Sequence, residues 1–194
     1  MTTGGKKEGK GKVKLPQVVT RGKVSLPKGL QSIASELGTL AIMWGGLESD
    51  VAEFLAVMLG KHGETGAAIV GHIELKQRLQ IIKHLAFILK PDEVWYEKVL
   101  APINLIDTHL SEERNRMFHD FWTDSVDPEK MTRIKLKPKI DKTNGVQRLV
   151  QERKDLHHSD IADLAYRVFM TRLKINTCRF FLKRHLEKQA LPEK

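Results

Sequence analysis

The sequence predicts an all-α fold, an up-and-down bundle of four main helices with a short β-hairpin inserted between the third and fourth helices. Three observations lead to this prediction. Apolar residues recur at spacings of three and four through most of the chain, and glycines and prolines separate these periodic segments. One segment, residues 131–153, alternates with a period of two instead. We therefore expect a single helical domain over residues 30–190.

The first two helices are expected to pack as an antiparallel hairpin. The first covers residues 31–59, in which Trp44 and Leu47 belong to one apolar stripe. Three glycines are expected to end it: Gly60, Gly63 and Gly66. The second covers residues 67–89 and stops before Pro91. The short connection between the two favours antiparallel neighbours.

The third helical region covers residues 92–121 and contains Pro102. A proline inside a helix removes a backbone hydrogen bond and clashes with the preceding turn, so we expect a kink or short break near Leu100. The alternating segment that follows contains Asn144-Gly145, a strong hairpin turn signal, with residues 146–150 as the return strand.

The fourth helix is expected over residues 160–188, with Ser159 as its N-cap. Most of its large apolar residues recur at helical spacing and are expected to face inward. The hairpin is therefore read as an insertion in a helical domain and not as a domain of its own.

Charge is distributed unevenly along the chain. Residues 1–29 carry eight Lys and Arg against one Glu, a net charge of +7, whereas the remaining residues together carry +2. A Gly- and Lys-rich segment with few large apolar residues cannot offset its ordering entropy, so residues 1–29 are expected to be a disordered basic tail. Such a tail is either a non-specific contact for polyanions or a solubilising leader.

Composition also limits the compartment and the cofactors. A single cysteine, Cys178, excludes an internal disulfide and any metal site built from several cysteines, and it is typical of a reducing compartment. The N-terminus lacks the apolar core of a secretory signal, and no segment has the apolar length of a membrane span. The sequence predicts a cytoplasmic protein that uses no metal, no cofactor and no membrane.

Residues 113–120 read Glu-Arg-Asn-Arg-Met-Phe-His-Asp and are the most informative stretch of the chain. On a helix, Asn115 and His119 are four residues apart and share a face, while Arg114 reaches them with its long side chain. Arginine is a permanent forked cation that matches phosphate oxygens, and histidine can give or take a proton near neutral pH. This combination suits chemistry on a phosphodiester.

These residues resemble the motif of the HEPN family, helical domains marked by Arg-(Asn/Asp/His)-x-x-x-His near the end of the third main helix. Trp44-Gly45-Gly46-Leu47-Glu48 is also similar to the aromatic-x-x-Leu-Glu of the first helix in many of these proteins. The resemblance covers roughly residues 31–188. Asp120 departs from the pattern, because many members have glycine there. A carboxylate beside His119 would repel phosphate and raise the pKa of the imidazole.

The resemblance implies a metal-independent endoribonuclease whose two motifs meet across a homodimer, in a toxin or antiviral defence setting with an antitoxin or regulatory partner. The required chemistry is consistent with the residues. RNA cleavage without a metal needs a base for the 2′-hydroxyl, stabilisation of the phosphate charge and an acid for the leaving oxygen. We assign His119 as general base or acid, Arg114 as the phosphate clamp and Asn115 as an orienting partner.

Three further residues are expected to support this site. Arg116 is a candidate phosphate contact, although a solvent-facing charge is the alternative interpretation. Trp122 lies three residues past His119 and is a candidate substrate contact, although an anchor in the core or an interface is the favoured interpretation of this tryptophan. Glu48 is a candidate partner that holds Arg114 in place, with a plain surface carboxylate as the alternative. A non-catalytic module of the same fold that binds nucleic acid or protein is the alternative function.

Overall fold

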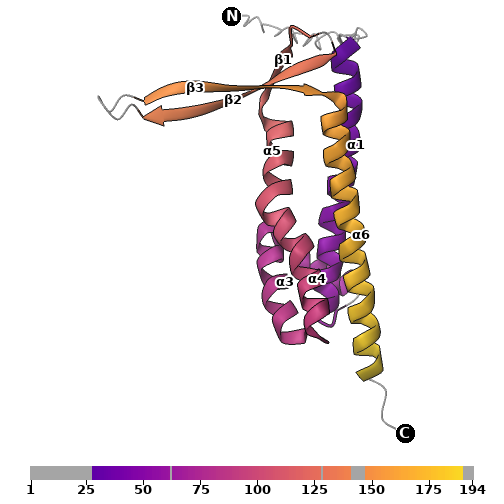
Figure 1. Ribbon diagram of the computed structural model, residues 1–194. Coiled ribbons are helices and arrows are strands. Elements are labelled where there is room, and N and C mark those ends of the chain that lie inside the picture. Colours follow the sequence, from indigo (N-terminus) through magenta and orange to yellow (C-terminus); the bar gives the residue numbers. More distant parts are fainter. Residues whose placement is uncertain (1–27, 62, 128, 141–146, 190–194) are drawn as a thin grey trace, which may run out of the picture.

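The computed structural model describes residues 28–61, 63–127, 129–140 and 147–189. The described chain is mostly helical, with a small three-stranded antiparallel sheet across one end of the helices (Figure 1). This confirms the mostly helical class. The predicted tail lies outside the described residues except for its last two, which begin the first helix, and the predicted turn Asn144-Gly145 also lies outside them.

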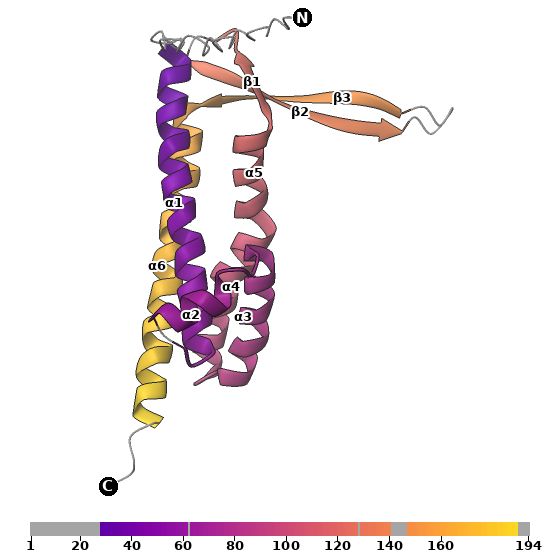
Figure 2. The same cartoon turned by 180° about the vertical axis from the view of Figure 1, so that it is seen from behind.

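The two longest helices, α1 (Lys28–Met58) and α6 (His158–Gln189), lie side by side along the bundle, as both views show (Figures 1 and 2). Arg172 of α6 crosses to α1, where its Nε lies 2.7 Å from Asp50 Oδ2. Gly46 lies against this crossing, where a Cβ would be 2.3 Å from the guanidinium carbon of Arg172 and would push the guanidinium aside. Both long helices begin at the end of the bundle that carries the sheet.

The prediction of one continuous second helix is wrong. Two helices occupy this region, α2 (Gly63–Val70) and α3 (Leu75–Leu89), separated by residues 71–74. Gly60 follows the end of α1 and Gly63 starts α2. Both have φ above +60°, in the left-handed region of backbone conformation that favours glycine. Figure 2 shows α2 lying across the back of α1, apart from α3.

The third helical region consists of α4 (Glu93–Leu105), a single π-helical turn η1 (Ile106–Leu110) and α5 (Ser111–His119). Of the predicted kink or short break near Leu100, the break is absent: α4 continues through this position with Pro102 buried inside it. The missing N–H of Pro102 would leave the carbonyl of Lys98 without its helical partner. The Cys178 thiol of α6, whose Sγ lies 3.5 Å from that carbonyl oxygen, donates to it instead.

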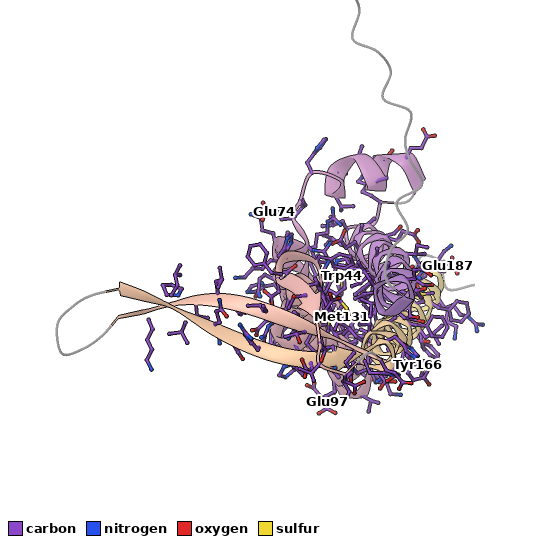
Figure 3. All side chains as sticks on the ribbon, turned by 90° about the horizontal axis from the view of Figure 1, so that it is seen from above. Trp44, Glu74, Glu97, Met131, Tyr166 and Glu187 are labelled. Atoms are coloured by element: carbon purple, nitrogen blue, oxygen red, sulfur yellow. The ribbon has the colours of Figure 1, made fainter. Side chains whose placement is uncertain are left out.

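The sheet contains three strands in the order β1-β2-β3: β1 (Phe121–Asp124), β2 (Lys130–Ile140) and β3 (Gln147–His157). The predicted two-stranded hairpin is therefore incomplete, because β1 follows α5 directly where the sequence analysis expected helix to residue 121. Strands β2 and β3 project beyond the bundle, as the view down its axis shows (Figure 3). We call this pair, residues 130–140 and 147–157, the β-arm.

Strand β3 runs directly into α6 at His158. The predicted Ser159 cap is wrong, because the Asp160 carboxylate accepts the backbone N–H of His157 at 2.8 Å. Ser159 Oγ instead lies 2.9 Å from His157 Nδ1. These hydrogen bonds join the end of the β-arm to the start of the longest helix.

The core is continuous from the helices into the base of the sheet. Met131 and Leu156 are cross-strand partners in β2 and β3, and both belong to the buried apolar cluster formed by α1, α3, α4 and α6. Burial of such side chains stabilises the fold by roughly 1.5–3 kcal/mol each. None of the helices in the described part of the chain is both long and apolar enough to cross a membrane.

Candidate functional site on helix α5

Helix α5 presents the Arg114, Asn115 and His119 group at the surface, close to the junction with the sheet (Figure 1). Asn115 and His119 are exposed, and Met117 is the residue of α5 that is buried against the core. The π-helical turn just before α5 shifts the phase of the following side chains relative to α4. The two exposed residues therefore face solvent while Met117 keeps the helix attached to the bundle.

Arg114 is held between aromatic rings. Its guanidinium carbon lies 5.6 Å from the ring centroid of Trp44 and 5.0 Å from that of Phe118. Its Nη1 donates to Asn115 Oδ1 at 3.0 Å, while its Nε is buried without a hydrogen-bond partner. Arginine is well suited to such stacking, which orients the planar cation without neutralising it. No carboxylate among the described residues forms an ion pair with Arg114, which is thus a positive charge held in place by aromatic rings.

Glu48 acts on this arrangement through Trp44. The Trp44 indole N–H donates to Glu48 Oε1 at 2.7 Å, one turn along α1. Among the described residues, no ion pair joins Glu48 to Arg114, the contact that the sequence analysis expected. Glu48 therefore orients the ring on which the guanidinium of Arg114 rests.

A charged cluster that sequence reasoning missed lies at the end of α5. Asp120 Oδ2 is 3.5 Å from Arg116 Nε and 3.3 Å from Arg133 Nε. Arg133 comes from β2, is 4% exposed and also places Nη1 3.5 Å from the Met117 sulfur. Burial lowers the pKa of the Arg133 guanidinium, Arg116 adds to this shift, and Asp120 opposes it. An arginine nevertheless keeps its proton.

This cluster changes the expected roles of two residues. Asp120 is paired with two guanidinium groups, so its charge beside His119 is compensated. Arg116 is partly buried and also lies 3.6 Å from Glu152 Oε1 of β3, so it is not a free surface charge. Asp120 and Glu152 together balance the two guanidiniums, so Asp120 is not a free negative charge next to the motif. The phosphate repulsion predicted from Asp120 is thereby offset.

Trp122 anchors the turn from α5 into β1. Its indole N–H donates to the carbonyl of Met117 at 3.1 Å, which satisfies one of the free carbonyls at the helix end. The side chain is partly buried against the core. Trp122, the candidate substrate contact of the sequence analysis, therefore uses its N–H group within the protein.

Glu113 fixes α5 relative to α6. Its Oε1 accepts from Arg167 Nη1 at 3.0 Å, and its second oxygen also contacts that guanidinium. The pair raises the pKa of Arg167. An exposed ion pair of this kind contributes modestly to stability, but its forked geometry limits rotation of α5.

A cavity of about 1050 Å³ lies elsewhere, between α1, α2 and α6, and is lined by residues that include Glu53, Lys61 and Asn176. None of the motif residues lines it. We place the candidate site at α5 because the phosphate-matched side chains gather there, whereas the cavity wall combines small apolar residues with charges of both signs. In the described part of the chain, no three His, Cys, Asp or Glu residues gather as metal ligands would.

Comparison with known proteins identifies no relative of this chain. No protein-family model, curated protein or solved structure matches the chain.

Proposed function

We propose that the protein is a metal-independent endoribonuclease of the HEPN type that acts as a homodimer. The observation that carries this proposal is the exposed group on α5, where Arg114 is stacked against Trp44 and Phe118 and bonded to Asn115. His119 is exposed one turn further along the same helix. A positioned cation and a titratable ring next to each other at the surface match the needs of phosphodiester cleavage.

In the proposed reaction, the 2′-oxygen forms a bond to the adjacent phosphorus and the bond from phosphorus to the 5′-oxygen breaks. A base accepts the 2′-hydroxyl proton, and an acid gives a proton to the departing 5′-oxygen. The products are a 2′,3′-cyclic phosphate and a 5′-hydroxyl end. Arg114 stabilises the charge on the non-bridging oxygens, with Asn115 fixing its orientation.

The need for two proton carriers supports the homodimer. Each motif offers one imidazole, His119, and a second copy of the chain supplies another. Helix α6 also exposes apolar side chains at spacings of three, four and seven residues, a surface that a second copy can bury. These side chains are Tyr166, Phe169, Leu173 and Phe180.

The finer fold description and the setting belong to the same proposal. We take α1, α3, α6 and the rod formed by α4, η1 and α5 as the four main helices of the domain, with α1 and α6 running in the same direction and not in the alternating order of the up-and-down bundle that the sequence predicted. We further propose a cytoplasmic role in a toxin or antiviral defence system, controlled by an antitoxin or regulatory partner. A lone cysteine and an RNA substrate favour that compartment.

One observation favours the alternative, a non-catalytic binding module. Among the described residues, no hydrogen bond or ion pair orients the ring of His119. Catalytic histidines are commonly oriented by a hydrogen bond at their second nitrogen. A module that holds nucleic acid or protein would not need that orientation.

Substitution of His119 by alanine distinguishes the two functions. We expect the cleavage rate of single-stranded RNA in EDTA to fall about 100- to 10,000-fold, the usual contribution of a general acid or base. RNA affinity should be retained, because the cation Arg114 remains. His72→Ala is the matched control, since His72 is exposed in the turn before α3 and should leave the rate unchanged. Equal cleavage by the His119 variant and the wild type would refute the nuclease.

A further inference from the structure

The positive charge of the folded part is concentrated in the β-arm. Its two strands carry eight Lys and Arg against two Asp and Glu, a net charge of +6. Everything else from residue 30 onward carries a net charge of −4. A domain that is nearly neutral overall therefore has a strongly polarised surface, with the cationic pole on one projecting element.

The strand register places much of this charge on one face. Successive side chains of a strand alternate between faces, so Lys135, Lys137 and Lys139 of β2 lie on the same side. Arg133 and Lys154 are cross-strand partners on that side as well. The opposite side carries fewer charges, because it combines apolar residues such as Leu136 and Leu149, both exposed, with polar ones such as Gln151. We call the cationic side the basic face.

The base of the basic face contacts the motif helix. Lys135 Nζ lies 4.0 Å from Glu112 Oε1, and Arg116 Nη2 lies 3.6 Å from Glu152 Oε1. Glu112 and Arg116 of α5 are followed at helical spacing by His119, so all three lie on one side of that helix. The basic face therefore starts beside the candidate catalytic histidine and continues outward from it.

The outer lysines are accessible to a polyanion. Lys137 and Lys139 are exposed, and Lys137 shares Glu152 with Arg116. Exposed ion pairs are worth roughly 0–1 kcal/mol, so a phosphate can replace Glu152 as the partner of Lys137 at little cost. Lys139 has no ion-pair partner among the described residues.

We propose that the basic face holds the phosphates of an RNA strand that continues outward from the linkage at His119. This inference rests on the proposed function, because it assigns the arm to the substrate of that site. With a strand rise of about 3.3 Å per residue, Lys135, Lys137 and Lys139 span about 13 Å at intervals comparable to those between neighbouring phosphates. The recognition is of backbone charge and carries no base sequence.

The test measures RNA binding by the full chain carrying His119→Ala, which prevents cleavage during the measurement. The variant Lys135→Gln/Lys137→Gln/Lys139→Gln is compared with its parent by fluorescence anisotropy of a labelled 20-nucleotide single-stranded RNA of mixed sequence. Three lost phosphate contacts should reduce the slope of log affinity against log salt by about 2. Between 50 and 200 mM salt, the parent should lose about 20-fold more affinity than the variant.

Two matched variants show whether position and charge are responsible. Lys76→Gln/Lys98→Gln/Lys188→Gln removes the same charge from exposed sites on α3, α4 and α6 and should change the slope by less than about 0.5. Replacing the three arm lysines by arginine should preserve the parental slope. Circular dichroism and thermal unfolding identify any variant that has lost its fold. If the glutamine variant of the arm has unfolded, the salt slope of the arginine variant is compared with that of the control variant instead.

An unchanged slope in the arm variant overturns the proposal, and so does an equal loss in the control variant. A failure of the nuclease proposal gives a different result, namely RNA cleavage that His119→Ala does not alter. In an active background, the arm variant should raise KM about tenfold on the 20-nucleotide RNA but leave kcat/KM for a dinucleotide unchanged. An equal loss on the dinucleotide would also overturn the arm proposal, because that substrate is too short to reach it.

Discussion

Substitution of Asp120 by asparagine tests the charged cluster at the end of α5. The asparagine keeps the shape of the side chain but removes the carboxylate that compensates Arg116 and Arg133, at 3.5 and 3.3 Å. Arg133 is the decisive partner because it is 4% exposed and cannot recover its hydration. The substitution therefore leaves the buried guanidinium of Arg133 without its ion-pair partner. Glu152 and Glu113 also raise the pKa of Arg133, but neither forms an ion pair with it among the described residues.

The magnitude follows from two opposing effects. Removal of one partner from a buried ion pair costs about 3–5 kcal/mol, because the other charge remains without compensation. Asp120 also follows the last residue of α5, where a negative charge opposes the helix dipole, so neutralising it returns about 0.3–1 kcal/mol. The expected net loss is about 2–5 kcal/mol, or roughly 4–19 °C in Tm for a chain of this size.

Urea unfolding followed by circular dichroism measures the loss. Asp124→Asn makes the same chemical change at an exposed position in β1 and should stay within about 0.5 kcal/mol of the wild type. The double variant Asp120→Asn/Arg133→Met should recover most of the stability, because the uncompensated charge is gone. If Asp120→Asn is as stable as the Asp124 control, the cluster does not stabilise the sheet against α5.

Two further predictions concern Glu48 and Cys178. Glu48→Gln retains an acceptor for the Trp44 indole and should preserve the RNA cleavage rate, whereas Glu48→Ala should lower it about tenfold by releasing the ring beneath Arg114. Equal losses in both variants would show that the charge of Glu48 acts on Arg114 directly. Burial raises the pKa of the Cys178 thiol. Its contribution to stability is thus complete below the unfolded-state pKa of about 8.5 and is lost as pH rises through the folded-state value. Urea unfolding between pH 8 and 10.5 should show a larger decline for the wild type than for Cys178→Ala, and a matching decline in both would contradict this.

The long helices were predictable because their stabilising pattern is local. The apolar stripe of α1 recurs at helical spacing, and the structure extends that helix only slightly, from the predicted residues 31–59 to Lys28–Met58. Strand β1 was not predictable in the same way. Its four residues continue the apolar spacing of α5, and they form a strand only because β2 pairs with them.

Helix α4 continues through Pro102 because of a contact with a residue that is distant in the sequence. Proline should break α4 because it leaves the Lys98 carbonyl without a donor. The Cys178 thiol satisfies that carbonyl, and the Trp95 indole in turn donates to the Cys178 carbonyl at 3.1 Å. These contacts join residues about 80 positions apart, so no pattern within α4 could have predicted them.

Some residues of the candidate site could be predicted from the sequence and others could not. Arg114, Asn115 and His119 were found because one helix carries them all, and helical spacing alone determines which of them share a face. Arg133 was missed because it reaches the end of α5 from β2, and an arginine in an alternating strand gave no signal of burial. Arg133 stands between Thr132 and Ile134, and the alternation of apolar and charged residues assigned its side chain to solvent.

The net charge of the folded part does not show how its charges are distributed over the surface. The residues beyond position 29 carry a net charge of only +2, which describes a folded part that is nearly neutral overall. Electrostatic attraction depends on where charges lie, because unlike charges farther apart than about 8 Å are screened from one another at physiological salt. The β-arm separates +6 from the −4 of the rest, so a polyanion near it meets lysines well before it meets the compensating carboxylates. RNA affinity should consequently follow the charge of the β-arm, even in variants whose total charge is restored by new lysines on α3 or α4.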